Sequence, residues 1–164
     1  MSPSEYLTSD HRRLETLFAA ALETGEVDLA RYDAFRIGLL RHIAIEETIV
    51  LPLVREGKGS FFADRQLHLE HGAIAALLVP PPTPDVTRAL AALLQKHNLL
   101  EETDRTLYDV LDDCSRGTRP DLVDRMREHP APPLSKNINN PDGLDPARRA
   151  VARAGYDFDK LAGG

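Results

Sequence analysis

Two short segments of the chain carry the same pattern of histidine and glutamate. The segment HIAIEET spans residues 42–48, and the segment HNLLEET spans residues 97–103. A further histidine precedes each copy, His11 before the first and His71 before the second. In both segments a glutamate follows a histidine by four residues, so on a helix the imidazole and the carboxylate lie one turn apart on one face. Side chains placed in this way can bind the same metal ion, and two such pairs predict two ions.

Four amphipathic segments are predicted to carry these residues. A capping box at residues 2–5 starts the first helix, and Pro52 predicts a kink near the end of the second. Apolar side chains recur at three- and four-residue steps, and the histidines and glutamates lie on or beside these apolar faces. The predicted helices span residues 3–24, 28–56, 62–79 and 84–114.

Long helices joined by short loops favour an all-α fold, here an antiparallel up-down-up-down four-helix bundle over residues 3–116. No segment alternates as a strand would. Residues 117–164 are rich in proline and are predicted to form a tail with one or two short helices, near residues 120–128 and 145–154. We expect this tail either to lie against the bundle or to bind another molecule.

The bundle predicts the height of each candidate ligand. Two residues at one height on successive antiparallel helices lie symmetrically about the loop between them. The midpoint of 11 and 42 is 26.5, that of 46 and 71 is 58.5, and that of 71 and 97 is 84; all three fall on predicted loops. The six side chains should therefore converge within one helical turn, or about 6 Å of helix rise. They are His11, His42, Glu46, His71, His97 and Glu101.

Six polar groups on inward faces need partners, because an unpaired carboxylate or imidazole is costly to bury. A metal supplies the partner. Imidazole and carboxylate ligands without thiolate suit iron, manganese or zinc, and paired carboxylates that can bridge favour two ions. Iron is the first choice, and Glu46 and Glu101 are each predicted to contact both ions.

These motifs resemble the hemerythrin-like family. The pattern is an early histidine, then HxxxE, a histidine on the third helix, and a final histidine with a carboxylate. It is met by His11, by HIAIE from His42, by His71 in LEHGAI, and by HNLLE from His97, within residues 3–114. The resemblance implies a non-haem di-iron centre with bridging carboxylates and an oxo- or hydroxo-bridge.

The chain departs from the oxygen-carrying members of that family, which have HxxxH on the third helix and close with HxxxxD. Here Leu67 and Ala75 lie four residues either side of His71, and the last carboxylate is Glu101. The set of four histidines and two glutamates is similar to that of members that handle iron or answer oxidative and nitrosative stress. An open metal position favours a small diatomic or peroxide ligand over reversible oxygen carriage. Peroxide- or nitric-oxide-reactive di-iron activity is the enzymatic form of this expectation.

Several neighbours of the six residues have two interpretations each. His68 either supplies a fifth imidazole from the face of His71 or lies on the flank of that face. Glu47 and Glu102 are expected at the surface or next to the ligands, because each is rotated about 100° from the glutamate before it. Tyr108 either packs in the core or donates a hydrogen bond near the site, and Cys114 is expected to be a small core residue.

The composition excludes some functions. The chain has 20 Lys and Arg against 26 Asp and Glu, and it has no basic stripe with interleaved aromatics, so nucleic acid is not expected as a partner. The N-terminal residues lack the apolar stretch of a signal peptide, and no run approaches the length of a membrane span. A single cysteine fits the cytoplasm. Two other functions stay open: an iron or redox sensor that signals to a protein partner through its tail, and a structural bundle with zinc or without metal.

Overall fold

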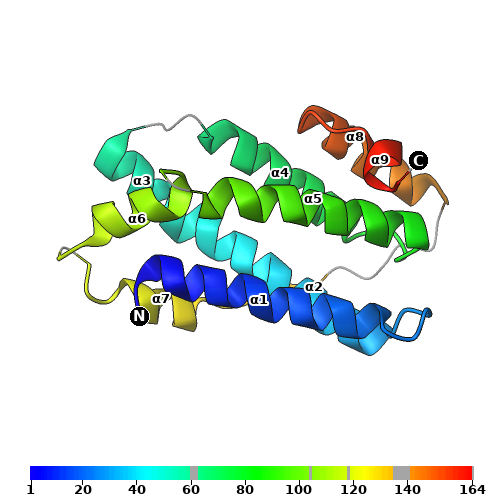
Figure 1. Cartoon of the computed structure of the whole chain (residues 1–164), viewed down its shortest axis with the longest axis horizontal. Coiled ribbons are helices and arrows are strands. Elements are labelled where there is room, and N and C mark those ends of the chain that lie inside the picture. Colours follow the sequence, from blue (N-terminus) through cyan, green and yellow to red (C-terminus); the bar gives the residue numbers. More distant parts are fainter. Residues whose placement is uncertain (60–62, 104, 118, 135–140, 164) are drawn as a thin grey trace. The chain divides into compact units, whose positions relative to one another are not determined.

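The computed structural model describes residues 1–59, 63–103, 105–117, 119–134 and 141–163 (Figure 1). Over these ranges the regular elements are all helical, which confirms the all-α prediction. The chain divides into two compact units: residues 1–62 with 101–134, and residues 63–100 with 135–164. They are called the first and the second unit below. Within the described ranges no helix combines the length and the apolar character needed to cross a membrane.

The first unit is built around a helical hairpin. Its helices α1 and α2 pack on each other, with the rings of His11 and His42 4.5 Å apart and those of Phe18 and Phe35 also 4.5 Å apart. Both pairs have their midpoint at 26.5, in the connecting loop, so the two helices are antiparallel in the predicted register. The elements of this unit are α1 (Pro3–Leu22), α2 (Leu29–Ile45), a π-helical turn (Glu46–Val50), α3 (Leu51–Lys58), α6 (Leu107–Ser115) and α7 (Leu122–Glu128).

The second unit pairs a long helix of the predicted bundle with a helix of the predicted tail. Here α4 packs against α8, and α8 packs against α9. The apolar face of α8 consists of small buried residues, which allow close approach to α4. Its elements are α4 (Asp64–Leu77), α5 (Pro84–Glu102, whose last two residues belong to the first unit), a 3-10 turn (Pro141–Gly143), α8 (Leu144–Arg153) and α9 (Phe158–Leu161).

The helix starts follow the predicted caps. The hydroxyl of Ser2 accepts from the backbone N–H of Glu5, and the Glu5 carboxylate accepts from the N–H of Ser2, so both halves of the capping box form. The Asp28 carboxylate accepts from the N–H of Arg31 at 3.1 Å and caps α2. These contacts satisfy backbone donors that have no partner within the first turn of a helix.

The second predicted helix continues past its predicted end. Just before Pro52 the chain widens into the π-helical turn, where the N–H of Leu51 donates to the carbonyl of Glu46 five residues earlier. The wide turn accommodates a proline that lacks an N–H and whose ring would crowd the carbonyl four residues back. The helix ends at Gly59, with φ of 76°, and not before Gly57. Gly57 serves packing, since a Cβ there would lie 2.7 Å from the Sγ of Cys114.

The third and fourth predicted helices also differ from the structure at their ends. The predicted start of the third at Phe62 lies outside the described residues, and its described part ends at Leu77, ahead of the prolines that begin at Pro80. The fourth, predicted to run to residue 114, ends at Glu102, and α6 begins at Leu107.

Local hydrogen bonds explain the break after α5. The hydroxyl of Thr106 donates to the carbonyls of Glu101, at 2.8 Å, and of Thr103, and the N–H of Thr106 also donates to Thr103. Arg105 has φ of 65°, and its N–H donates to the Asp109 carboxylate. Short polar side chains thus take the place of helical backbone partners, and the break sets the direction of α6.

Candidate metal centre

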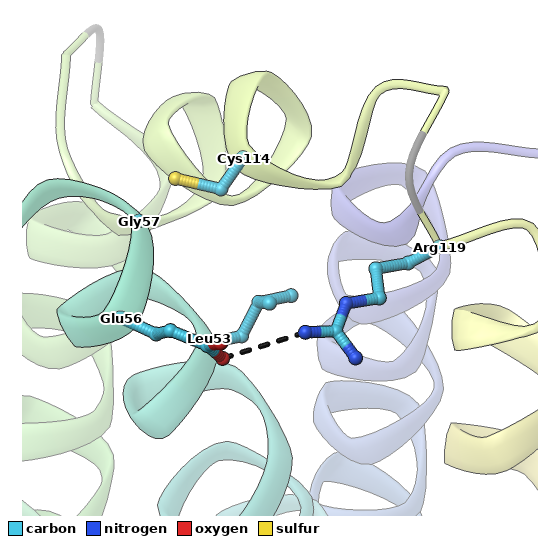
Figure 2. Close-up of a pocket in the computed structure, with 5 residues that line it drawn as sticks. All are labelled: Leu53, Glu56, Gly57, Cys114 and Arg119. Carbon is cyan, nitrogen blue, oxygen red and sulfur yellow. Dashed lines mark hydrogen bonds and ion pairs between the residues drawn. The ribbon is translucent and has the colours of Figure 1, made fainter.

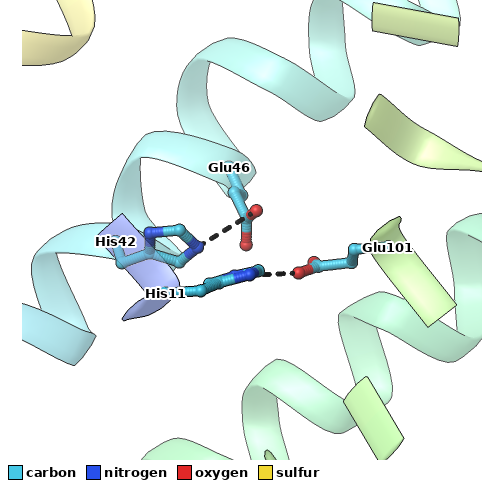
Figure 3. Close-up of side chains that lie close together, drawn as sticks. All are labelled: His11, His42, Glu46 and Glu101. Carbon is cyan, nitrogen blue, oxygen red and sulfur yellow. Dashed lines mark ion pairs between the residues drawn. The ribbon is translucent and has the colours of Figure 1, made fainter. Parts of the chain in front are cut away.

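Four of the six predicted ligands form a buried cluster in the first unit. His11 comes from α1, His42 from α2, Glu46 from the first position of the π-helical turn, and Glu101 from the end of α5 (Figure 3). Each is at most 2% exposed, and each offers one ligand atom within 4.8 Å of the others. The Nε2 of His42 lies 3.3 Å from Oε1 of Glu46, and the Nε2 of His11 lies 3.4 Å from Oε2 of Glu101. These four residues are called the His-Glu cluster below.

Each imidazole of the His-Glu cluster is oriented by a carboxylate at Nδ1, the ring nitrogen that does not face the cluster. Nδ1 of His42 lies 3.0 Å from Oδ2 of Asp10, and Nδ1 of His11 lies 2.6 Å from Oε1 of Glu102. When the imidazole is neutral, a carboxylate at Nδ1 favours a proton there, so that Nε2 keeps the lone pair that a metal would need. Histidine ligands of metals commonly have this second partner, which fixes ring orientation and tautomer. Glu102 was expected near the ligands or at the surface, and it lies near them.

Arginines hold two of these carboxylates in place. Arg13 donates to Asp10 at 2.7 Å, and Arg12 donates to Glu102 at 2.6 Å. Burial would raise the pKa of Asp10, but the hydrogen bonds from His42 and Arg13 outweigh it and lower that pKa to about 2. Asp10 is therefore an anion near neutral pH, and it can orient His42 whether or not a metal is bound.

Tyr108 lies at the centre of the same group of atoms. Its hydroxyl donates to Oε1 of Glu46 at 2.7 Å, lies 3.2 Å from Oε2 of Glu101, and lies 3.1 Å from Nε2 of His11. Burial, together with the two carboxylates, raises the pKa of this phenol well above its ordinary range. Of its two interpretations from the sequence, the structure supports the hydrogen-bonding one. Three potential acceptors thus converge on a single hydroxyl proton.

The charge balance of the His-Glu cluster fits a cation. Burial disfavours the imidazolium form of His42, but attraction to Glu46, with further contributions from Asp10 and Glu101, raises the pKa of His42 to about 10. Among the described residues, Nε2 of His42 has no partner with hydrogen-bond geometry. Donor atoms around one ion with bonds of about 2.1 Å lie roughly 3–4 Å apart, so small side-chain movements would let these four residues hold a metal.

The other two predicted histidines meet in the second unit. The rings of His71, from α4, and His97, from α5, lie 4.8 Å apart in an edge-to-face arrangement, and both are nearly fully buried. Nδ1 of His97 lies 2.9 Å from Oε2 of Glu70, which repeats the carboxylate–imidazole pair of the first unit. His68 lies on the same helix as His71 but is exposed, so the structure does not place it with the buried histidines. Its role as a ligand stays a prediction.

Sequence reasoning found the imidazoles and carboxylates of the HxxxE repeat, but it missed Asp10 and Glu70. An available signal is that each of these acids directly precedes one of the separate histidines, His11 and His71. Both acids are buried, which is unusual for carboxylates without a partner.

The single cysteine lies apart from the candidate ligands. A cavity of about 260 Å³ in the first unit is lined by Leu53, Glu56, Gly57, Cys114 and Arg119, and an ion pair of 3.4 Å joins Arg119 to Glu56 (Figure 2). None of the six predicted ligands lines this cavity. Cys114 packs beside α3 but is partly exposed, so it differs from the small core residue that was expected.

The comparison with protein families agrees with the residues of this site. A model of the hemerythrin HHE cation-binding domain matches residues 2–129, which include all six predicted ligands. No curated protein and no solved structure matched the chain. The family match covers well over half of the 164 residues, and the buried His-Glu cluster within it fits a metal ion. The chain therefore belongs to the hemerythrin HHE cation-binding domain family.

Proposed function

We propose that the protein is a non-haem di-iron protein of hemerythrin type that reacts with or senses oxygen, peroxide or nitric oxide. The observation that carries the proposal is the His-Glu cluster, in which two buried imidazoles and two buried carboxylates offer ligand atoms within 4.8 Å of one another. Family membership supports a cation as the group that these atoms would bind.

The proposal of a second iron is based on the internal repeat. In this proposal His11 and His42 would bind one iron and His71 and His97 the other, and Glu46 and Glu101 would supply the carboxylates that the sequence pattern predicts to be shared. Its support is the equal height predicted for these residues in an antiparallel four-helix bundle over residues 3–116, followed by a tail at 117–164. Each histidine pair is in ring contact within its own unit.

The protein residues would bind and orient the metal and control protons around it. Asp10 and Glu102 keep Nε2 of their histidines directed into the cluster. Tyr108 keeps a hydroxyl proton within reach of both glutamates. Iron supplies one-electron redox chemistry and positions for small ligands, and a set with four histidines leaves room for such a ligand. A cytoplasmic location is part of the proposal and is based on the single cysteine.

Anaerobic reconstitution with ferrous iron tests this function. We expect two irons per chain, and changes in the near-ultraviolet and visible spectrum when the reduced protein meets oxygen, peroxide or nitric oxide. His71→Ala should lower the iron content, whereas His68→Ala, three residues away on the same helix and exposed, should leave it nearly unchanged. Iron well below one per chain after reconstitution would refute the proposal, and an unchanged thermal stability with and without chelator would favour a metal-free structural bundle.

A further inference from the structure

Tyr156 connects the C-terminal segment to the carboxylate behind His97. Its hydroxyl donates to Oε1 of Glu70 at 2.5 Å, while Oε2 of Glu70 lies 2.9 Å from Nδ1 of His97. Tyr156, Glu70 and His97 all belong to the second unit. Tyr156 lies beyond residues 2–129, the part of the chain that the family match covers. The contact therefore joins a residue outside the matched domain to a residue within it.

Gln66 makes a second link to the same carboxylate. Its side-chain amide donates to Oε1 of Glu70 at 2.8 Å and to the carbonyl of Ala154 at 2.8 Å. Glu70 is fully buried, whereas Tyr156 and Gln66 are partly exposed, so both donors approach the carboxylate from the outer side of the unit's interior. Oε1 of Glu70 is thereby held by two donors that are tied to the C-terminal segment, and Oε2 is left to accept from His97.

The end of α8 fixes the position of Tyr156. The N–H of Gly155, which has φ of 88°, donates to the carbonyl of Ala152, and the N–H of Tyr156 donates to that of Val151 at 3.1 Å. This pair of bonds is a Schellman motif, in which the residue after the glycine has a defined direction. Because Val151 and other small residues of α8 are buried against α4, the motif holds Tyr156 close to Glu70.

The three carboxylates behind histidines are held in two different ways. Asp10 and Glu102 are held by Arg13 and Arg12, whose charges act without help from the C-terminal segment. Glu70 is held by the neutral donors of Tyr156 and Gln66. The orientation of His97 therefore depends on residues 141–163.

We propose that Tyr156 is a positioning residue for His97, through which the C-terminal segment sets the tautomer of that imidazole and, with it, the metal affinity of the second histidine pair. Tyr156 and Gln66 hold Glu70 so that it accepts from Nδ1–H of His97, and Nε2 then carries the lone pair a metal needs. The affinity part of this inference rests on the proposed function, whereas the tautomer part does not.

The tautomer is measured on the full-length, metal-free protein by ¹⁵N NMR of its imidazoles. We expect the Nδ1–H form of His97 to dominate in the wild type and a mixture of tautomers in Tyr156→Phe. Tyr6→Phe is the matched control: Tyr6 is also half-buried, and its hydroxyl contacts Arg41 in the first unit, so it should leave His97 unchanged. In a Glu70→Gln background, Tyr156→Phe should add no further change. A His97 tautomer that is the same in Tyr156→Phe and in the wild type overturns the proposal.

The affinity is measured by competition for ferrous iron against a chelator. Loss of the hydrogen-bond partner of a histidine ligand commonly weakens metal binding by about 10- to 100-fold. We expect Tyr156→Phe to lower the affinity for the weaker-bound of the two irons by a factor in this range. Tyr6→Phe should bind both irons as tightly as the wild type. Equal affinities of wild type and Tyr156→Phe would overturn the coupling to metal. If the wild type binds no iron, the proposed function fails, and the NMR measurement still decides the positioning role.

Discussion

Replacing Tyr108 by phenylalanine should destabilise the metal-free protein much more than the metal-loaded protein. The variant keeps the buried ring and removes the hydroxyl that donates to Oε1 of Glu46 at 2.7 Å. Without metal, the fully buried Glu46 loses that donor, and an unsatisfied buried acceptor costs about 1–3 kcal/mol. In a protein of this size each kcal/mol lowers Tm by about 2–4 °C, so the metal-free variant should melt roughly 2–12 °C lower.

With metal bound, Glu46 has a cation as its partner, so the same substitution should cost much less. Thermodynamic linkage then requires the variant to bind iron more tightly by the difference, between about 5- and 150-fold for 1–3 kcal/mol. The assays are thermal melts of both forms and a chelator competition. Tyr32→Phe is the control, because Tyr32 is equally buried and its hydroxyl has no hydrogen-bond partner in the part of the chain described. Equal destabilisation of both forms of Tyr108→Phe, or weaker iron binding, would refute this reasoning.

Three further substitutions or conditions test the site and its surroundings. Glu46→Gln should remove both irons, whereas Glu47→Gln, at the next and less buried position, should retain them, as measured by metal analysis. In the metal-free protein, the pKa of His42 is raised from 6.5 to about 10, so its contribution to stability is complete below pH 6.5 and is lost as the pH rises through about 10. Iron affinity should rise over the same interval, because binding needs the neutral imidazole. Urea titrations across this pH range test the expected fall in stability, and chelator competition tests the expected rise in iron affinity. Gly57→Ala should destabilise the protein by about 1–2 kcal/mol, because crowding at 2.7 Å from Cys114 exceeds the gain in helix propensity of about 1 kcal/mol, and a second substitution, Cys114→Ala, should restore most of the loss.

The sequence predicts the presence of the helices better than it predicts where they end. A stripe of apolar residues recurs over many turns, so its signal accumulates, whereas a helix end depends on a few local contacts. Gly57 and Gly59 are equally plausible stops in the sequence, and packing against Cys114 decides that the helix continues through the first and ends at the second. The side-chain hydrogen bonds of Thr106 likewise end α5 without any interruption of the apolar pattern.

The same break explains why the role of Tyr108 was left open. In an uninterrupted helix Tyr108 would lie seven residues, or about 10 Å along the axis, beyond Glu101. At that distance the phenol would be a core residue two turns from the site. The interruption after Glu102 instead brings its hydroxyl to 3.2 Å from Oε2 of Glu101. A departure from regular helix, which periodicity does not predict, thus brings a hydroxyl group into contact with the cluster.

The repeated unit of this chain is longer than the HxxxE motif from which it was recognised. An acid–histidine dipeptide occurs at residues 10–11 and again at 70–71, and in each case the acid bonds the first histidine of the following HxxxE motif, His42 or His97. Adjacent residues on a helix point about 100° apart, so each acid is directed away from its own neighbour and towards the next helix. Each copy therefore supplies two imidazoles, one carboxylate proposed as a metal ligand and one orienting carboxylate. The copies differ in what holds the orienting acid. In the first copy it is an arginine one turn away, and in the second it is a tyrosine of the C-terminal segment, so that segment contacts the acid that orients His97.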